Sequence, residues 1–111
     1  MDAKSQQALA EFGKDFNCCQ SVLSVYAEES GLDRDIAMKL SVGFGGGMGR
    51  MGEICGAVTG AFMVIGLNFG SAKPGQSRER KRTFELAGKF AQSFKARNNS
   101  IICRCSVRIS F

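Results

Sequence analysis

Histidine and tryptophan are both absent from this chain of 111 residues. Without histidine the chain cannot form a Ser–His or Cys–His catalytic pair, nor a zinc site of mixed cysteine and histidine ligands. It has a single tyrosine, Tyr26, so its core has to be built from phenylalanine, aliphatic residues, methionine and alanine. The chemistry left open therefore belongs to thiols, carboxylates and cationic groups.

The first residues lack the basic and then apolar run of a secretory signal peptide. This predicts a cytoplasmic protein whose thiols are kept reduced. Hydrophobic residues make up 44% of the chain and charged residues 23%, which is typical of a folded globular protein. We expect one helical domain over residues 1–111.

Acidic residues are scarce in the second part of the chain. Residues 1–35 hold seven acidic and three basic side chains, a net charge of −4, whereas residues 36–111 hold three acidic and twelve basic ones, a net charge of +9. An asymmetric basic half attracts acidic partners. Because aromatic residues are not interleaved with the basic ones except near Phe84, we expect a solvated helix face and no nucleic-acid partner.

Hydrophobic periodicity predicts an all-α fold, a small single-domain bundle of about five helices with a central glycine-rich loop. Asn17 and Gln20 form a capping-box pattern at the start of the second helix, and Gly31 is expected to terminate it in a left-handed conformation. Asp33 is the expected cap of the third helix. The helices are expected at about residues 3–13, 18–29, 34–42 and 53–68, and from Gln76 or Ser77 onward.

The fourth predicted helix has no charge after Glu53 until Lys73. The uncharged run 54–72 is 19 residues long but contains four glycines, so we expect a helix buried in the centre of the bundle rather than a membrane span. Glycines recur every four residues from Gly52, which lets another backbone approach closely. The fifth helix starts with basic residues and then carries a stripe that predicts core packing, namely Phe84, Ala87, Phe90, Ala91 and Phe94.

Five cysteines are many for a reduced compartment, where cysteines more often bind metal or cycle through oxidation than form permanent disulfides. Cys18 and Cys55 each lie in the first turn of a predicted helix, where the amides and the helix dipole favour a thiolate. Cys19 fits the apolar stripe of its helix and is expected to pack in the core. Cys103 and Cys105 form a C-x-C pair, which can ligate a soft metal or form an easily reduced disulfide.

Five of the seven residues from Gly43 to Gly49 are glycines, which predicts a loop with unusual backbone angles over residues 43–52. The segment matches G-x-G-x-x-G, but no predicted strand precedes it, so dinucleotide binding is not expected. We expect its amides, including that of Gly49, to lie over Cys55 and, with Arg50, to stabilise the thiolate or a bound anion. The alternative is that the glycines only let two helices cross closely.

Three segments in this order resemble the redox-active proteins of the CGAxxG family, also called the C-GCAxxG-C-C proteins. They are Asn17-Cys18-Cys19-Gln20-Ser21-Val22, the glycine segment 43–50, and Cys55-Gly56-Ala57-Val58-Thr59-Gly60. The resemblance covers about residues 10–103 and implies a small helical protein with four characteristic cysteines, of which Cys18, Cys55 and Cys103 match three. The resemblance also implies an atypical, truncated tail from about residue 104, because family members continue well beyond the point where Cys105 stands.

The leading hypothesis is a thiol redox protein with thiol-disulfide oxidoreductase-like activity, acting with a redox partner that the sequence does not identify. Cys18, Cys55 and Cys103 would converge, and two of them would cycle between dithiol and disulfide. Whether this amounts to an enzyme stays open. A homodimer and an association with a membrane protein stay open as alternatives, whereas membrane insertion is not expected.

Two other functions follow from the same residues. A metal-binding module would use Cys18, Cys55, Cys103 and Cys105 to hold zinc, copper(I) or an iron–sulfur cluster, and no other cofactor is expected. A non-catalytic interaction protein would use its cysteines only for packing.

Overall fold

The computed structural model describes residues 3–103. Their regular structure is helical, with five α-helices and one short 3₁₀ helix, which confirms the predicted all-α fold. None of the described helices has both the length and the hydropathy needed to cross a membrane. The elements in chain order are α1 (Ala3–Gly13), α2 (Cys18–Ala27), α3 (Arg34–Ser41), η1 (Val42–Phe44), α4 (Gly56–Phe69) and α5 (Ser77–Asn98).

Capping side chains fix the starts of α2 and α3. The Asn17 side chain accepts a hydrogen bond of 3.0 Å from the amide of Gln20, and the Gln20 side chain accepts one of 3.0 Å from the amide of Asn17. The Asp33 carboxylate accepts a bond of 3.2 Å from the amide of Ile36. Gly31 is left-handed with φ of 83°, as expected, although α2 itself ends earlier, at Ala27.

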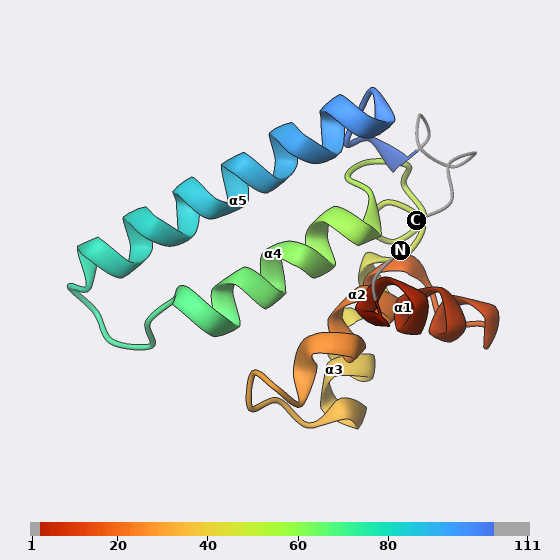
Figure 1. Cartoon of the computed structure of the whole chain (residues 1–111), viewed down its shortest axis with the longest axis horizontal. Coiled ribbons are helices and arrows are strands. Elements are labelled where there is room, and N and C mark those ends of the chain that lie inside the picture. The colour runs from red at the N-terminus through yellow and green to blue at the C-terminus, as the bar shows by residue number, and fades with distance from the viewer. Residues whose placement is uncertain (1–2, 104–111) are drawn as a thin grey trace.

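The helices form two groups (Figure 1). Helices α4 and α5 run side by side as a long hairpin, while α1, α2 and α3 form a second group in which α2 and α3 pack on α4 as far as Val64. Helix α4 contacts α2 on one side and α5 on the other, so it joins the two groups. The turn between α4 and α5 lies at the far end of the hairpin from the start of α4.

Two small clusters of buried residues form the core. One joins α2 to α3 through Leu23, Ala27 and Ala37. The other is centred on Cys55, Ala57 and Val58 at the start of α4, with Phe90 and Phe94 of α5 packed against it. A cysteine of the predicted site is therefore part of the core that joins α4 to α5.

Burial of α4 and α5 is less complete than the sequence predicted. Only the first turns of α4 are buried, and Phe62, Leu67 and Phe69 in its later turns are exposed, so the expectation of a helix buried along its length is wrong. Phe84, expected in the core stripe of α5, is 69% exposed. The reason is that α5 packs mainly on α4 alone, whereas α2 and α3 cover the opposite side of α4 as far as Met63 and Val64.

Residues 53–55, predicted as the first turn of the fourth helix, are instead paired with residues 101–103. The amide of Cys55 donates to the carbonyl of Ile101 at 2.7 Å, and the amide of Cys103 donates to the carbonyl of Glu53, around an antiparallel bridge between Ile54 and Ile102. Helix α4 therefore begins three residues later than predicted, with Cys55 as its N-cap. Asn99, left-handed with φ of 70°, ends α5 and turns the chain back toward this bridge.

Candidate functional site

The N-termini of α2 and α4 meet at a pair of thiols. Cys18 is the first residue of α2 and Cys55 is the N-cap of α4. The Cys18 thiol donates a hydrogen bond to the Cys55 sulfur. Both sulfurs therefore lie at helix ends whose free amides and dipoles favour negative charge.

Gly56 makes this approach of the two helices sterically feasible. A Cβ atom at Gly56 would lie 2.8 Å from the backbone nitrogen of Cys19 and 3.0 Å from the Cβ of Cys18. One turn later, a Cβ at Gly60 would lie 3.1 Å from the carbonyl oxygen of Cys19. The glycine face predicted for α4 is thus the surface on which α2 packs.

The surroundings of Cys55 favour its thiolate. The hydrogen bond from Cys18 lowers the pKa of Cys55 most, the amides of Ala57 and Val58 lower it further, and burial opposes them, leaving a pKa of about 6. These amides belong to the second and third residues of α4. The amide of Val58 donates to the backbone carbonyl of Cys55 at 2.9 Å, and the Cys55 side chain makes no capping hydrogen bond. Below the ordinary thiol range, a pKa of this kind makes Cys55 predominantly charged at neutral pH.

The surroundings of Cys18 have the opposite effect. The pKa of Cys18 is raised well above its ordinary value, first by its hydrogen bond to Cys55, then by burial and by the negative charges of Cys55 and Cys103. One proton is therefore shared unequally by the pair. Cys18 holds the proton and Cys55 holds the charge.

Cys19 is fully buried, as the sequence predicted. Burial raises the pKa of Cys19, and a hydrogen bond from the Thr59 side chain opposes the increase. Because it has no exposed surface and its thiol is hydrogen-bonded to Thr59, Cys19 serves as an internal comparison for Cys18 and Cys55.

Cys103 lies close to the same site. Side chains alternate along paired strands, so Cys55 and Cys103 project from one face of the bridge while Ile54 and Ile102 project from the other. Diagonal neighbours in an antiparallel pair are about 7–8 Å apart. Burial and the charge of Cys55 raise the pKa of Cys103. The bridge thus brings a third thiol near the pair. The sequence did not predict this pairing of residues 101–103 with residues 53–55.

The glycine segment packs against Cys103. A Cβ atom at Gly47 would lie 2.5 Å from the Cβ of Cys103 and 2.7 Å from the amide nitrogen of Glu53, so only glycine fits there. Five consecutive residues, 46–50, have φ between 63° and 75°. The carbonyl of Gly47 accepts a hydrogen bond of 3.0 Å from the amide of Glu53 and closes the loop onto the bridge.

Two residues of this left-handed run, Met48 and Arg50, are not glycine. A left-handed conformation costs a residue with a Cβ about 1–2 kcal/mol. The Arg50 side chain is exposed, and the groups that lower the pKa of Cys55 come from Cys18 and from α4. A role for Arg50 and Gly49 in stabilising the thiolate or an anion stays a prediction.

Replacing Arg50 with glycine is expected to raise the free energy of unfolding by about 1 kcal/mol, because glycine relieves the left-handed strain. Chemical denaturation measures this change, and Arg50→Lys, which keeps both the strain and the charge, is the matched control. Titration of Cys55 in the same two variants tests the charge of Arg50. If the pKa of Cys55 is higher in Arg50→Gly but not in Arg50→Lys, the charge of Arg50 stabilises the thiolate. If Arg50→Gly is no more stable than Arg50→Lys, the assigned strain is wrong.

All four cysteines in residues 3–103 are free thiols. In this part of the chain, no group of three or more cysteine, aspartate or glutamate side chains is placed to hold a metal ion. The predicted four-thiolate site also requires Cys105, which lies outside the described residues. Metal binding by Cys18, Cys55, Cys103 and Cys105 therefore stays a prediction.

Sequence reasoning missed two parts of the site. It did not predict the bridge that brings Cys103 to Cys55, for which the only signal was a short apolar run at Ile101 and Ile102. It also missed the specific role of Gly47, because no local pattern distinguishes it from the neighbouring glycines.

Comparison with known proteins gives one match. The sequence model of a family described as "Putative redox-active protein (C_GCAxxG_C_C)" matches residues 16–110. No curated protein and no solved structure matches the chain.

Proposed function

Because this chain belongs to the C_GCAxxG_C_C family of redox-active proteins, we propose that it exchanges electrons by cycling Cys18 and Cys55 between a dithiol and a disulfide. The observation that carries the proposal is the direct hydrogen bond between these two thiols where two helices begin. A disulfide requires the Cβ atoms of its cysteines to lie about 3.5–4.5 Å apart, and two hydrogen-bonded sulfurs need little backbone movement to reach that geometry.

The unequal sharing of one proton assigns a different step to each thiol. Cys55, as the thiolate, attacks a sulfur of a partner disulfide; a mixed disulfide forms and one partner thiolate leaves. Cys18 then loses its proton to the departing thiolate and attacks the Cys55 sulfur, which releases the second partner sulfur. The partner gains two electrons and the proton of Cys18, its second sulfur takes a proton from water to complete the dithiol, and the Cys18–Cys55 disulfide forms.

The raised pKa of Cys18 supports this order of events. Its causes, largest first, are the hydrogen bond to Cys55, burial, and the negative charges of Cys55 and Cys103, so two of the first three come from Cys55. When Cys55 enters a mixed disulfide, it no longer carries that charge, so Cys18 becomes easier to deprotonate at the moment when it has to attack. Before that moment Cys18 stays protonated and keeps Cys55 reactive.

Cys103 is the third thiol in this proposal. It projects from the same face of the bridge as Cys55 and is less buried. A Cys55–Cys103 disulfide is therefore the alternative product, and exchange between the two disulfides would pass oxidation from the Cys18–Cys55 pair toward the surface.

Peptide mapping after mild oxidation with a small disulfide tests the proposal. We expect a Cys18–Cys55 disulfide that a dithiol reductant reverses, and its loss in Cys18→Ala and in Cys55→Ala. Cys19→Ala is the matched control, because Cys19 is adjacent to Cys18 in sequence but is fully buried. This variant should retain the bridge. If neither a Cys18–Cys55 nor a Cys55–Cys103 bridge forms, and all thiols react slowly, the proposed cycle is wrong and the cysteines only pack.

A further inference from the structure

The far end of the α4–α5 hairpin, residues 67–84, carries an unusual concentration of positive charge. We call these residues the hairpin tip. They contain five basic side chains and one acidic side chain, Glu79, and therefore have a net charge of +4. In the part of the chain that the structure describes, no ion pair joins any of these basic residues to a carboxylate. The basic residues are Lys73, Arg78, Arg80, Lys81 and Arg82.

The same tip exposes large apolar side chains. Phe84 is 69% exposed, Phe69 41% and Leu67 40%. Arg82 lies over the ring of Phe69, 5.4 Å from its centroid, so charge and apolar surface are interleaved rather than segregated. Exposed apolar groups gathered in one place normally mark a contact surface.

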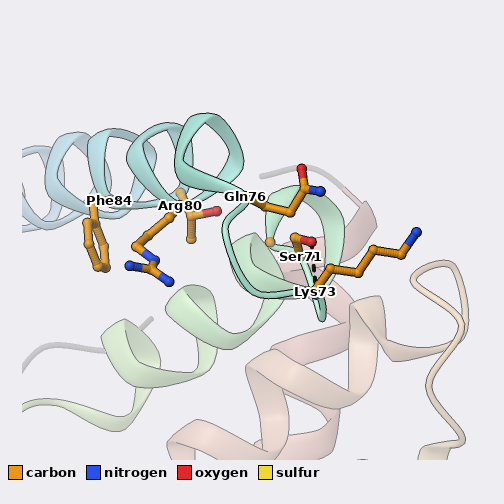
Figure 2. Close-up of a pocket in the computed structure, with 7 residues that line it drawn as sticks. Ser71, Lys73, Gln76, Arg80 and Phe84 are labelled. Atoms are coloured by element: carbon orange, nitrogen blue, oxygen red, sulfur yellow. Dashed lines mark hydrogen bonds between the residues drawn. The ribbon is translucent and has the colours of Figure 1, made fainter.

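The tip also holds a shallow hollow of about 160 Å³, whose lining includes Lys73, Arg80 and Phe84 (Figure 2). Arg80 and Phe84 lie next to each other on α5, while the Lys73 side chain extends in the opposite direction. Cations that diverge in this way cannot enclose one small anion. They suit an anionic surface that extends over several groups at once.

Three kinds of extended anionic surface can be compared. Recognition of nucleic acid uses polar contacts and aromatic stacking, so it would leave the exposed leucine beside the arginines without a contact. An acidic protein normally buries about 800 Å² on each partner, which favours a broad face, whereas this surface is the narrow end of a hairpin. An anionic bilayer fits best, because its phosphates meet the basic residues and its acyl boundary accepts apolar side chains.

We propose that the hairpin tip docks on the surface of an anionic lipid bilayer, with its basic residues at the headgroup phosphates and Phe84, Phe69 and Leu67 at the acyl boundary. This is contact with the membrane surface and requires no helix to cross the bilayer. The tip lies at the opposite end of the hairpin from the start of α4, where the thiol pair lies, so docking would leave the pair at a distance from the bilayer. The inference is independent of the proposed redox cycle.

Sedimentation of the full, reduced chain with lipid vesicles tests the proposal. We expect binding to phosphatidylcholine vesicles that contain about one third phosphatidylglycerol, little binding to phosphatidylcholine alone, and release by about 0.5 M salt. The double variant Arg80→Ser, Arg82→Ser should lower the partition coefficient about thirtyfold. Phe84→Ser should lower it roughly tenfold, because the serine cannot occupy the acyl boundary.

The double variant Lys89→Ser, Lys95→Ser is the matched control, since it removes the same charge from α5 outside the tip and should change binding less than about twofold. Equal losses in both double variants, or no preference for anionic vesicles, would overturn the proposal. Sedimentation equilibrium without lipid adds a second check. If the chain forms a stable dimer that persists in salt but is disrupted by Phe84→Ser, a second copy of the chain covers the tip instead. All four substituted side chains and Phe84 are exposed, so the variants should fold.

Discussion

Replacing Gly56 with alanine is expected to lower the free energy of unfolding by about 3 kcal/mol and to abolish formation of the Cys18–Cys55 disulfide. The added Cβ would lie 2.8 Å from a backbone nitrogen of α2 and 3.0 Å from the Cβ of Cys18. Backbone atoms at a helix start cannot rotate away as a side chain can, so α2 and α4 have to separate. That separation acts directly on the hydrogen bond between the two thiols.

Gly66→Ala is the matched control for this prediction. Gly66 lies in the same helix. Apart from the neighbouring backbone of that helix, no atom would lie within 4 Å of a Cβ atom at Gly66. Alanine is favoured over glycine in a helix by about 1 kcal/mol, so Gly66→Ala should be slightly more stable than the wild type. Denaturation curves and the rate of disulfide formation should be measured on both variants.

The outcomes separate the steric argument from a general intolerance of substitution in α4. If Gly56→Ala unfolds at the same denaturant concentration as Gly66→Ala, the two helices are not in the close contact described. If Gly56→Ala is destabilised but still forms the Cys18–Cys55 bridge at the wild-type rate, the helix contact is real but does not position the thiols.

Local signals in the sequence predicted the helices well. Asn17 with Gln20 and Asp33 marked two helix starts correctly, because a cap depends only on residues within one turn. The glycine face of α4 was also predictable, since its period of four residues belongs to the helix itself. These features do not depend on how distant parts of the chain meet.

Features that depend on distant contacts were not predictable. The start of α4 was placed three residues too early, because the pairing that holds Glu53 to Cys55 in an extended conformation comes from residues 101–103. Phe84 was assigned to the core because its spacing matches that of Phe90 and Phe94. Spacing identifies a face of a helix, but it does not show where the neighbouring elements end.

The same distinction applies to the thiols. That Cys18 and Cys55 sit at helix starts followed from local patterns, and so did the expectation of a stabilised thiolate. That Cys18 is the hydrogen-bond donor and Cys55 the acceptor did not, because it depends on how the two helices cross. The sequence supplied the chemistry available to each residue, and the packing of α2 on α4 assigns their roles.

Under reducing conditions, the free energy of unfolding is expected to rise by roughly 2–4 kcal/mol between pH 6 and pH 9 and to fall at higher pH. In the folded protein the pKa of Cys55 is lowered to about 6, whereas in the unfolded chain it has its ordinary value. Between these values the unfolded chain binds one more proton, so stability increases with pH. The contribution is complete above the unfolded pKa and is lost as pH falls through about 6.

The decrease at high pH has the opposite origin. The pKa values of Cys18, Cys19 and Cys103 are raised in the folded protein. Their contribution to stability is therefore complete below the ordinary thiol pKa and is lost above it, because the unfolded chain then releases protons that the folded protein retains. A maximum near pH 9 follows from the two effects together.

This pH profile can be assigned to thiols because the chain contains no histidine. Between pH 6 and pH 9 the only other group that ordinarily titrates is the terminal amine, which is common to all variants and cancels when they are compared. Denaturant titrations over this range should therefore give a nearly flat profile for Cys55→Ala, an unchanged rise for Cys19→Ala, and a smaller rise for Cys18→Ala, which lacks the main hydrogen-bond donor to Cys55. A wild-type profile as flat as that of Cys55→Ala would mean that Cys55 is an ordinary buried thiol, and the roles assigned to the pair would then have to be abandoned.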